Sequence, residues 1–275
     1  MAEVKTQNDL DFERKHEEDL RRIRDFRLMD DNFMSKVFED KPCAEFLLRI
    51  ILNRDDLKVK EVHGQHDLNN IQGRSVRLDI LAVDHENRAY NVEVQRSDSG
   101  AVAKRARYNS SLLDANLTRK GDAYDALNET YVIFITENDV LRGGLPIYHI
   151  NRIIEEMGKS FGDEAHIIYV NSQIKDDTAL GKLMHDFTCT NPDDMNYPVL
   201  AQRVRYFKED TKGVATMCRA FEEVARESAR DAEYQKAVRT AKKMLALGQL
   251  NLETIAECTE LSLDEVKALA DKKPA

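Results

Sequence analysis

Residues 77–84 and 89–95 read Arg-Leu-Asp-Ile-Leu-Ala-Val-Asp and Ala-Tyr-Asn-Val-Glu-Val-Gln, with His-Glu-Asn-Arg between them. Both runs are rich in aliphatic, β-branched and aromatic side chains, so they predict two antiparallel strands joined by a polar turn. A loop of three residues or of five gives the same register, in which paired residue numbers sum to 172. In that register Asp79 lies opposite Glu93.

Two carboxylates placed opposite each other on neighbouring strands repel, because their Cβ atoms lie only about 5 Å apart. A divalent cation would compensate for this repulsion, since Mg²⁺ is commonly held by one or two carboxylates together with water and substrate phosphates. The alternative is a surface cluster of ion pairs in which Arg77 or Arg96 neutralises Asp79 and Glu93. A four-residue loop would shift the register by one and separate the two acids.

The composition limits the class of protein. Of the 275 residues 42% are hydrophobic and 33% are charged, which is typical of a globular protein with long solvated helices. No apolar run approaches the ~18 residues of a membrane span, and the first residues lack the pattern of a signal peptide, so we expect a cytoplasmic protein without a membrane partner. The net charge of −9 disfavours broad attraction to nucleic acid. Residues 74–120, however, carry nine basic and six acidic side chains.

The cysteines and histidines show no familiar metal-binding spacing. His63 and His66 would face opposite sides of a strand. The absence of a C-x-x-C pair argues against both a zinc site and a disulfide framework. The four cysteines are Cys43, Cys189, Cys218 and Cys258.

The hydrophobic periodicity predicts an α/β sandwich with a mixed sheet, because the order is helix, three strands, helix, strand. A charged helix is expected over residues 9–28, and a buried helical layer from Asp30 to Asn53 with a break near Pro42. Besides the hairpin, we expect strands at 57–62, 130–136 and 165–170, a helix at 101–117, and loops at 69–73 and 191–198.

The C-terminal part predicts a long charged helix over 213–247 and then two short helices over 252–269, the second capped by Ser262. The spacing is similar to a helix-turn-helix, but Asp264 and Glu265 make the second short helix a poor fit to a DNA major groove. Packing or oligomerisation is the favoured role. The expected domains are 1–28, 29–208 and 209–275.

Several motifs occur in an order that resembles the PD-(D/E)xK nuclease superfamily, and more narrowly its transposase-like, recombination-promoting nuclease branch. They are Asp79, Glu93-Val-Gln95, Lys104-x-x-Arg107-Tyr108, Gly121-Asp-x-Tyr124 and the strand at 132–135. Asp31-x-x-Met34 resembles that branch's N-terminal motif, although Met34 and Ser35 stand where an aromatic residue and a lysine are usual. The resemblance covers roughly residues 28–190.

The resemblance implies a restriction-endonuclease-like αβββαβ core with helical N-terminal and C-terminal extensions. It also implies hydrolysis of DNA phosphodiesters that depends on Mg²⁺ or Mn²⁺, with low sequence specificity, in recombination or mobile-element activity. The catalytic residues would be Asp79, Glu93 and Gln95. The metal ligands would be Asp79, Glu93 and the backbone carbonyl of Val94, with Asp31 a candidate further ligand. The contacts to DNA phosphates would come from Lys104, Arg107 and Tyr108.

Gln95 departs from the pattern of the superfamily, which usually has a lysine at this position. A neutral amide stabilises developing negative charge less well than an ammonium group, so weaker activity is expected. The alternative is a nuclease-fold protein with weak or no activity that acts as a DNA-binding or protein-interaction module. Assembly of several copies through the helical extensions is a further alternative.

Overall fold

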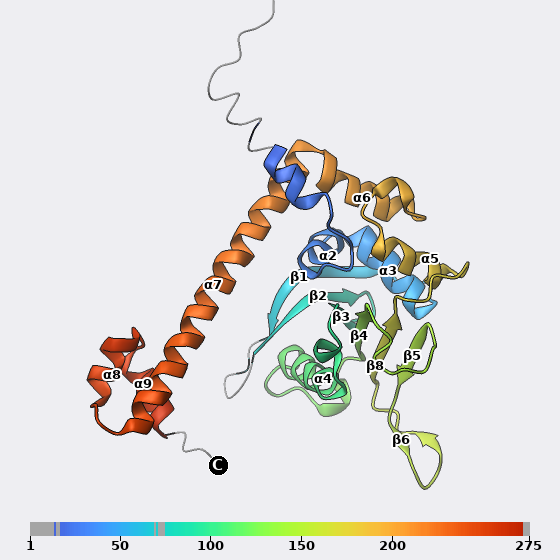
Figure 1. Ribbon diagram of the computed structural model, residues 1–275. Coiled ribbons are helices and arrows are strands. Elements are labelled where there is room, and N and C mark those ends of the chain that lie inside the picture. The colour runs from blue at the N-terminus through green and yellow to red at the C-terminus, as the bar shows by residue number, and fades with distance from the viewer. Residues whose placement is uncertain (1–13, 15–16, 69, 71–74, 272–275) are drawn as a thin grey trace, which may run out of the picture. The chain divides into compact units, whose positions relative to one another are not determined.

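The computed structural model describes residues 14, 17–68, 70 and 75–271 (Figure 1). The chain divides into two compact units, Met1–Cys218 and Arg219–Ala275. The domain boundaries expected at residues 28 and 208 stay predictions. Within the described residues, no helix is both long enough and apolar enough to span a lipid bilayer.

The larger unit is built on a six-stranded mixed sheet with the strand order β1-β2-β3-β4-β8-β5. The first three strands are antiparallel, β3, β4 and β8 are parallel, and β5 is antiparallel to β8. The strands are β1 (Val59–Leu68), β2 (Val76–Asp84), β3 (Ala89–Gln95), β4 (Thr130–Thr136), β5 (Ile147–Ile150) and β8 (Ala165–Asn171), with a separate pair β6 (Ile153–Ile154) and β7 (Lys159–Ser160). The mixed sheet confirms the α/β fold predicted from the sequence.

Helices cover both faces of this sheet (Figure 1). On one face α4 packs its buried side chains against strands, with Leu112 and Leu113 next to Leu81 and with Ala106 next to Val132. On the other face α2 contacts β1, β2 and β3, α3 contacts β1, and α5 and α6 pack on α3. The helices are α2 (Asp31–Phe38), α3 (Lys41–Leu52), α4 (Ala103–Leu117), α5 (Ala179–Thr188) and α6 (Pro198–Glu209).

The predicted hairpin register is confirmed. The pairs run from Val83↔Ala89 to Ile80↔Val92, and each pair sums to 172. On its other side β3 pairs in parallel with β4 along its whole length. Because the strand has neighbours on both edges and helices on both faces, Asn91 and Glu93 are fully buried along with its apolar residues.

Several elements differ from the sequence-based expectation. The first strand begins at Val59 and runs on to Leu68, and the predicted loop at 69–73 lies outside the described residues except for Asn70. The predicted loop at 191–198 contains a 3-10 helix at Pro192–Asp194, and α6 starts at Pro198, a residue suited to a first helical turn. Of the predicted helix over 9–28, the described part is helical at residue 14 and at residues 17–23.

The two strand histidines do not face opposite sides. Gln65 between them has φ of 48°, so the regular alternation of side chains is interrupted there. The rings of His63 and His66 therefore come within 5.6 Å of each other, measured between centroids.

The smaller unit contains α7 (Thr211–Leu247) from Arg219 onward, α8 (Leu252–Thr259) and α9 (Leu263–Asp271). Its buried core consists of Ala241, Ile255, Leu261 and Val266. The Ser262 cap is present as a reciprocal pair, because Glu265 N donates to Ser262 Oγ and Ser262 N donates to Glu265 Oε2.

Loss of this cap should loosen α9 selectively. We expect Ser262→Ala to destabilise the helix by about 0.5–2 kcal/mol, because one amide at its N-terminus loses its acceptor. Hydrogen exchange of the full-length chain, read by mass spectrometry, should show faster exchange in peptides from α9. Equal acceleration in peptides from α4 would contradict a local effect.

Candidate functional site

Two acidic side chains meet where β2 and β3 separate. The main-chain pairing of these strands ends at Ile80↔Val92. Beyond that point Val94 N donates to Asp79 Oδ2 at 2.9 Å, so a side chain replaces the main-chain acceptor. This bond draws Asp79 towards β3, next to Glu93. The carbonyl of Val94 lies on the same strand edge as its N–H and so faces the Asp79 side.

Arg105, in the first turn of α4, connects three groups of the site. Its Nη2 donates to Glu93 Oε2 at 2.7 Å, and its Nη1 donates to Gln95 Oε1 at 3.1 Å and to the carbonyl of Gly100 at 2.9 Å. Sequence reasoning missed this residue. The signal that could have found it is its position seven residues before the buried Leu112, which places Arg105 on the arc of the helix that faces the sheet.

The arginines expected to neutralise the acid pair were the wrong ones. Arg77 Nε donates to Asp67 at 2.9 Å, and Arg96 Nη1 donates to Asp30 at 2.9 Å. Both of these partners lie outside the opposed pair. The compensating positive charge comes instead from Arg105 of α4, the helix that follows the hairpin in sequence.

Gly100 makes the arrangement around Gln95 sterically feasible. A Cβ atom at this position would lie 1.9 Å from Gln95 Oε1, which is far inside van der Waals contact. Any other residue at this position in the 3-10 turn at Asp98–Ala101 would therefore force the Gln95 amide to move.

The electrostatics of the site disfavour two negative charges. Burial, the charge of Glu93 and the charge of Asp31 raise the pKa of Asp79 well above its ordinary value. Burial raises the pKa of Glu93 as well, although Arg105 opposes this shift. The amide of Asn91 lies close enough to Glu93 to favour its charged form, yet neither amide atom makes a hydrogen bond of good geometry.

Asp31, at the start of α2, interacts electrostatically with the site. It is the first residue of α2 and is exposed, and its Oδ1 accepts a hydrogen bond from the backbone N–H of Asn32 at 2.8 Å. Its influence on the pKa of Asp79 shows that the two carboxylates are near enough to interact. The preceding residue, Asp30, is the N-cap of the helix but makes no side-chain capping bond.

A family model for the PD-(D/E)XK nuclease family transposase matches residues 37–179, which is just over half of the chain. The chain belongs to the PD-(D/E)XK nuclease family transposases. The match includes the hairpin, α4 and the five strands β4 to β8, and it leaves out Asp31 and everything beyond the start of α5. No curated protein and no solved structure was found to match the chain.

Nucleases of the PD-(D/E)XK family generally use divalent metal ions, and the donor set here fits such an ion. Among the described residues, the buried Glu93 Oε1 has no hydrogen-bond partner of good geometry, which is costly for a carboxylate oxygen unless a cation or a proton meets it. Asp79 and the carbonyl of Val94 add oxygen donors of the kind that Mg²⁺ and Mn²⁺ prefer.

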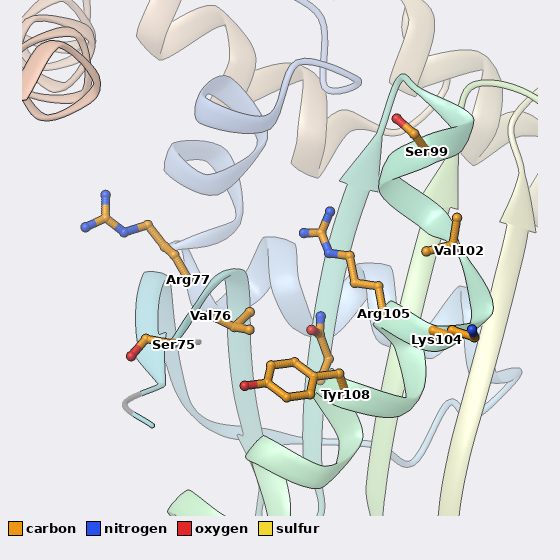
Figure 2. Close-up of a pocket in the computed structure, with 9 residues that line it drawn as sticks. Ser75, Val76, Arg77, Ser99, Val102, Lys104, Arg105 and Tyr108 are labelled. Atoms are coloured by element: carbon orange, nitrogen blue, oxygen red, sulfur yellow. The ribbon is translucent and has the colours of Figure 1, made fainter. Parts of the chain in front are cut away.

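A pocket of about 620 Å³ opens beside the site, between the first residues of β2 and the first turns of α4. Figure 2 shows Arg77 on the β2 side and Arg105 and Tyr108 on the α4 side. Lys104 also lines the pocket, whereas Arg107 is exposed on α4 outside the lining. Of the three predicted phosphate contacts, Lys104 and Tyr108 therefore line this pocket and Arg107 lies outside it.

Proposed function

We propose that this chain is a metal-dependent endodeoxyribonuclease that hydrolyses DNA phosphodiesters with low sequence specificity, in recombination or mobile-element activity. The observation that carries the proposal is the convergence of Asp79 and Glu93 where β2 and β3 separate, with one buried Glu93 oxygen lacking a partner. Membership of a nuclease family makes nucleic acid the substrate class.

Asp79, Glu93 and the Val94 carbonyl would hold Mg²⁺ or Mn²⁺, with Asp31 as a candidate further ligand, because its charge acts on Asp79. A bound divalent ion supplies Lewis acidity at the phosphoryl oxygen and lowers the pKa of a bound water. Two facing carboxylates with raised pKa values suit a divalent ion, because its charge offsets the repulsion between them.

Arg105 and Gln95 would act together where the family signature has a lysine. Arg105 fixes Glu93 through Oε2 and leaves Oε1 without a hydrogen bond. Arg105 Nη1 donates a hydrogen bond to Gln95 Oε1, so the NH₂ group of the Gln95 amide points away from Arg105. That NH₂ can then donate to a phosphate oxygen or to the attacking water.

The direct test is incubation of purified full-length protein with supercoiled plasmid, with Mg²⁺, with Mn²⁺ and with EDTA. We expect nicked and then linear plasmid in the presence of either metal, and intact plasmid in EDTA. Cleavage of unrelated sequences at similar rates would support low specificity. Cleavage that persists in EDTA would contradict metal dependence.

A second candidate function is a nuclease-fold module that binds DNA without cutting it. The neutral Gln95, whose amide oxygen already accepts a hydrogen bond from Arg105, is the observation that favours it. Retained plasmid binding with no cleavage in either metal would support this alternative over the proposed nuclease.

Phosphate contacts from α4 should appear in the salt dependence of binding. We expect the double variant Lys104→Ala/Arg107→Ala to bind duplex DNA more weakly, and the slope of log K against log salt to become shallower by about two, since each lost phosphate contact removes about 0.9. Fluorescence anisotropy across a salt series measures both quantities. Lys159→Ala, which removes an exposed charge from β7, is the matched control and should leave the slope unchanged.

A further inference from the structure

The pocket beside the acid pair has a lining that suits a nucleotide outside the double helix. Its volume of about 620 Å³ lies within the range of pockets that hold small organic ligands. Three of the described residues that line it are basic, and none is acidic. The side chains of Tyr108 and Asn109 add an aromatic ring and an amide. Positive charge together with an aromatic ring is the combination by which proteins bind the phosphates and bases of unpaired nucleic acid.

Tyr108 offers an aromatic surface to this pocket. Figure 2 shows its side chain extending from α4 towards the start of β2. The ring packs in part against the apolar cluster that contains Leu112 and Leu113, and Asn70 Nδ2 donates to its hydroxyl group at 2.9 Å. The side chain is nevertheless only half-buried. A nucleobase can stack on such a ring, and this contact does not depend on which base is present.

Asn109, the next residue of α4, brings a polar group to the pocket. Its side chain is fully buried, and neither its amide nitrogen nor its amide oxygen has a hydrogen-bond partner of good geometry among the described residues. A buried donor and acceptor without partners destabilise a fold, so a ligand that meets both would remove this cost. A ligand in the pocket reaches the amide by displacing the half-buried side chains that line the pocket beside it.

The donor and the acceptor of Asn109 match the edge of an unpaired base. Each of the four bases has a donor next to an acceptor on its Watson–Crick edge, and an amide can pair with either order by turning over. In duplex DNA this edge is occupied by the complementary base. The pocket would therefore accept any base, in agreement with low sequence specificity, but only a base that has left its pair.

The pocket adjoins the acid pair through Arg105. This arginine lines the pocket and donates to Glu93 Oε2 at 2.7 Å. On the β2 side Arg77 pairs with Asp67, and such an exposed ion pair contributes little to stability, so a phosphate can compete with it. Lys104 adds a third positive charge. A nucleotide in the pocket would thus place an adjacent phosphate near the acid pair.

We propose that the pocket binds an unpaired nucleotide of a DNA strand, with its base stacked on Tyr108 and hydrogen-bonded to Asn109. The protein would therefore prefer DNA that contains unpaired bases. The inference rests on the proposed nuclease function, because the phosphate next to this nucleotide would be the one that is hydrolysed. Bubbles, gaps and single-stranded tails offer such nucleotides, whereas a fully paired duplex does so only at the cost of breaking a base pair.

Binding can be tested without cleavage, with the full-length chain in EDTA. The probes are two fluorescein-labelled DNAs of equal length and charge, one fully paired and one with a short run of central mismatches. Anisotropy at one salt concentration compares their affinities. We expect the mismatched DNA to bind about tenfold or more tightly than the paired DNA. Equal affinities, or no binding of either DNA, would overturn the proposal.

Three variants and one control assign the preference to the pocket. Tyr108→Ala should reduce the ratio of the two affinities to about threefold or less, whereas Tyr108→Phe keeps the ring and should keep the ratio. Asn109→Leu should lower the ratio without strongly destabilising the fold, because it removes an amide that lacks partners. Phe161→Ala, which removes an exposed ring next to β7, is the control and should keep the ratio. A preference that survives in folded Tyr108→Ala and folded Asn109→Leu would overturn the proposal.

Cleavage separates this inference from the nuclease proposal. With Mn²⁺ we expect the cuts in the mismatched DNA to fall beside the mismatches, as read on a sequencing gel. Cleavage of both DNAs, with equal affinities, would overturn the nucleotide pocket and leave the nuclease proposal intact. A binding preference without cleavage in either metal would contradict the nuclease proposal and support the pocket as part of a DNA-binding module.

Discussion

Asp79→Asn is expected to lower the rate of metal-dependent plasmid nicking by about 10²–10³-fold or more. The variant removes the negative charge that would hold the metal ion, while the amide oxygen still accepts the hydrogen bond from Val94 N. The local fold should therefore survive. Asp67→Asn, which removes an exposed carboxylate from β1, is the matched control and should cleave at close to the wild-type rate.

The same substitution should stabilise the metal-free protein at high pH. Because the folded-state pKa of Asp79 is raised, its contribution to stability is present below the unfolded pKa of about 4 and is lost as the pH rises through the folded pKa. At pH 8 in EDTA we expect Asp79→Asn to unfold with a free energy about 1–3 kcal/mol higher than the wild type.

Urea unfolding at several pH values measures this difference, which should shrink towards pH 4 because the wild-type carboxyl is then neutral as well. Addition of Mg²⁺ should reverse the order at pH 8, since the ion stabilises only the chain that binds it. Nicking at the wild-type rate by Asp79→Asn, or lower stability of that variant in EDTA at pH 8, would count against the site assignment.

Arg105→Ala is expected to lower the free energy of unfolding by about 2–4 kcal/mol at pH 8, because it leaves the buried Glu93 carboxylate without its partner. Arg105 lowers the pKa of Glu93, so its removal raises a folded-state value that is already above the unfolded one. Stability is then lost as the pH rises through this higher value. The loss should be smaller at pH 5, where Glu93 can take up a proton.

Urea unfolding of Arg105→Ala at pH 5 and pH 8 tests the charge argument, and two further variants separate charge from packing. Adding Glu93→Gln to Arg105→Ala should recover part of the stability lost at pH 8, since the uncompensated charge is gone. Arg105→Lys should be intermediate, because it keeps the charge but cannot bond Glu93 and Gln95 together. An equal loss at both pH values would point to packing alone.

The features that the sequence predicts well are those set by local alternation. The length of the turn between β2 and β3 decides which side chains lie opposite each other. The register in which paired residue numbers sum to 172 could therefore be worked out without tertiary information. The predicted strand over 130–136 begins and ends in the structure at the same residues, Thr130 and Thr136. Its short continuous apolar run is typical of a strand covered on both faces.

The features that it misses depend on contacts between distant segments. Glu93 lies in an alternating pattern that suits a half-exposed strand, and its complete burial follows only from the position of α4 over the sheet. Arg105 shares the sheet-facing arc of its helix with Leu112, but only the structure shows that this arc lies over Glu93. β5 at Ile147–Ile150 is a partly exposed edge strand of four residues, too short to give a clear pattern.

The pairing of β3 with two very different neighbours has a consequence for folding. Its contacts with β2 are local, and Asp79, Glu93 and Arg105 all fall within a short stretch of chain, so the opposed acids can meet early. Its partner on the other edge, β4, is about 40 residues further along the chain, and such pairings are slow to form. Glu93 is fully buried only when both α4 and β4 are in place, so a chain that has formed only the β2–β3 hairpin would hold the acid pair without the dry environment that sets its chemistry.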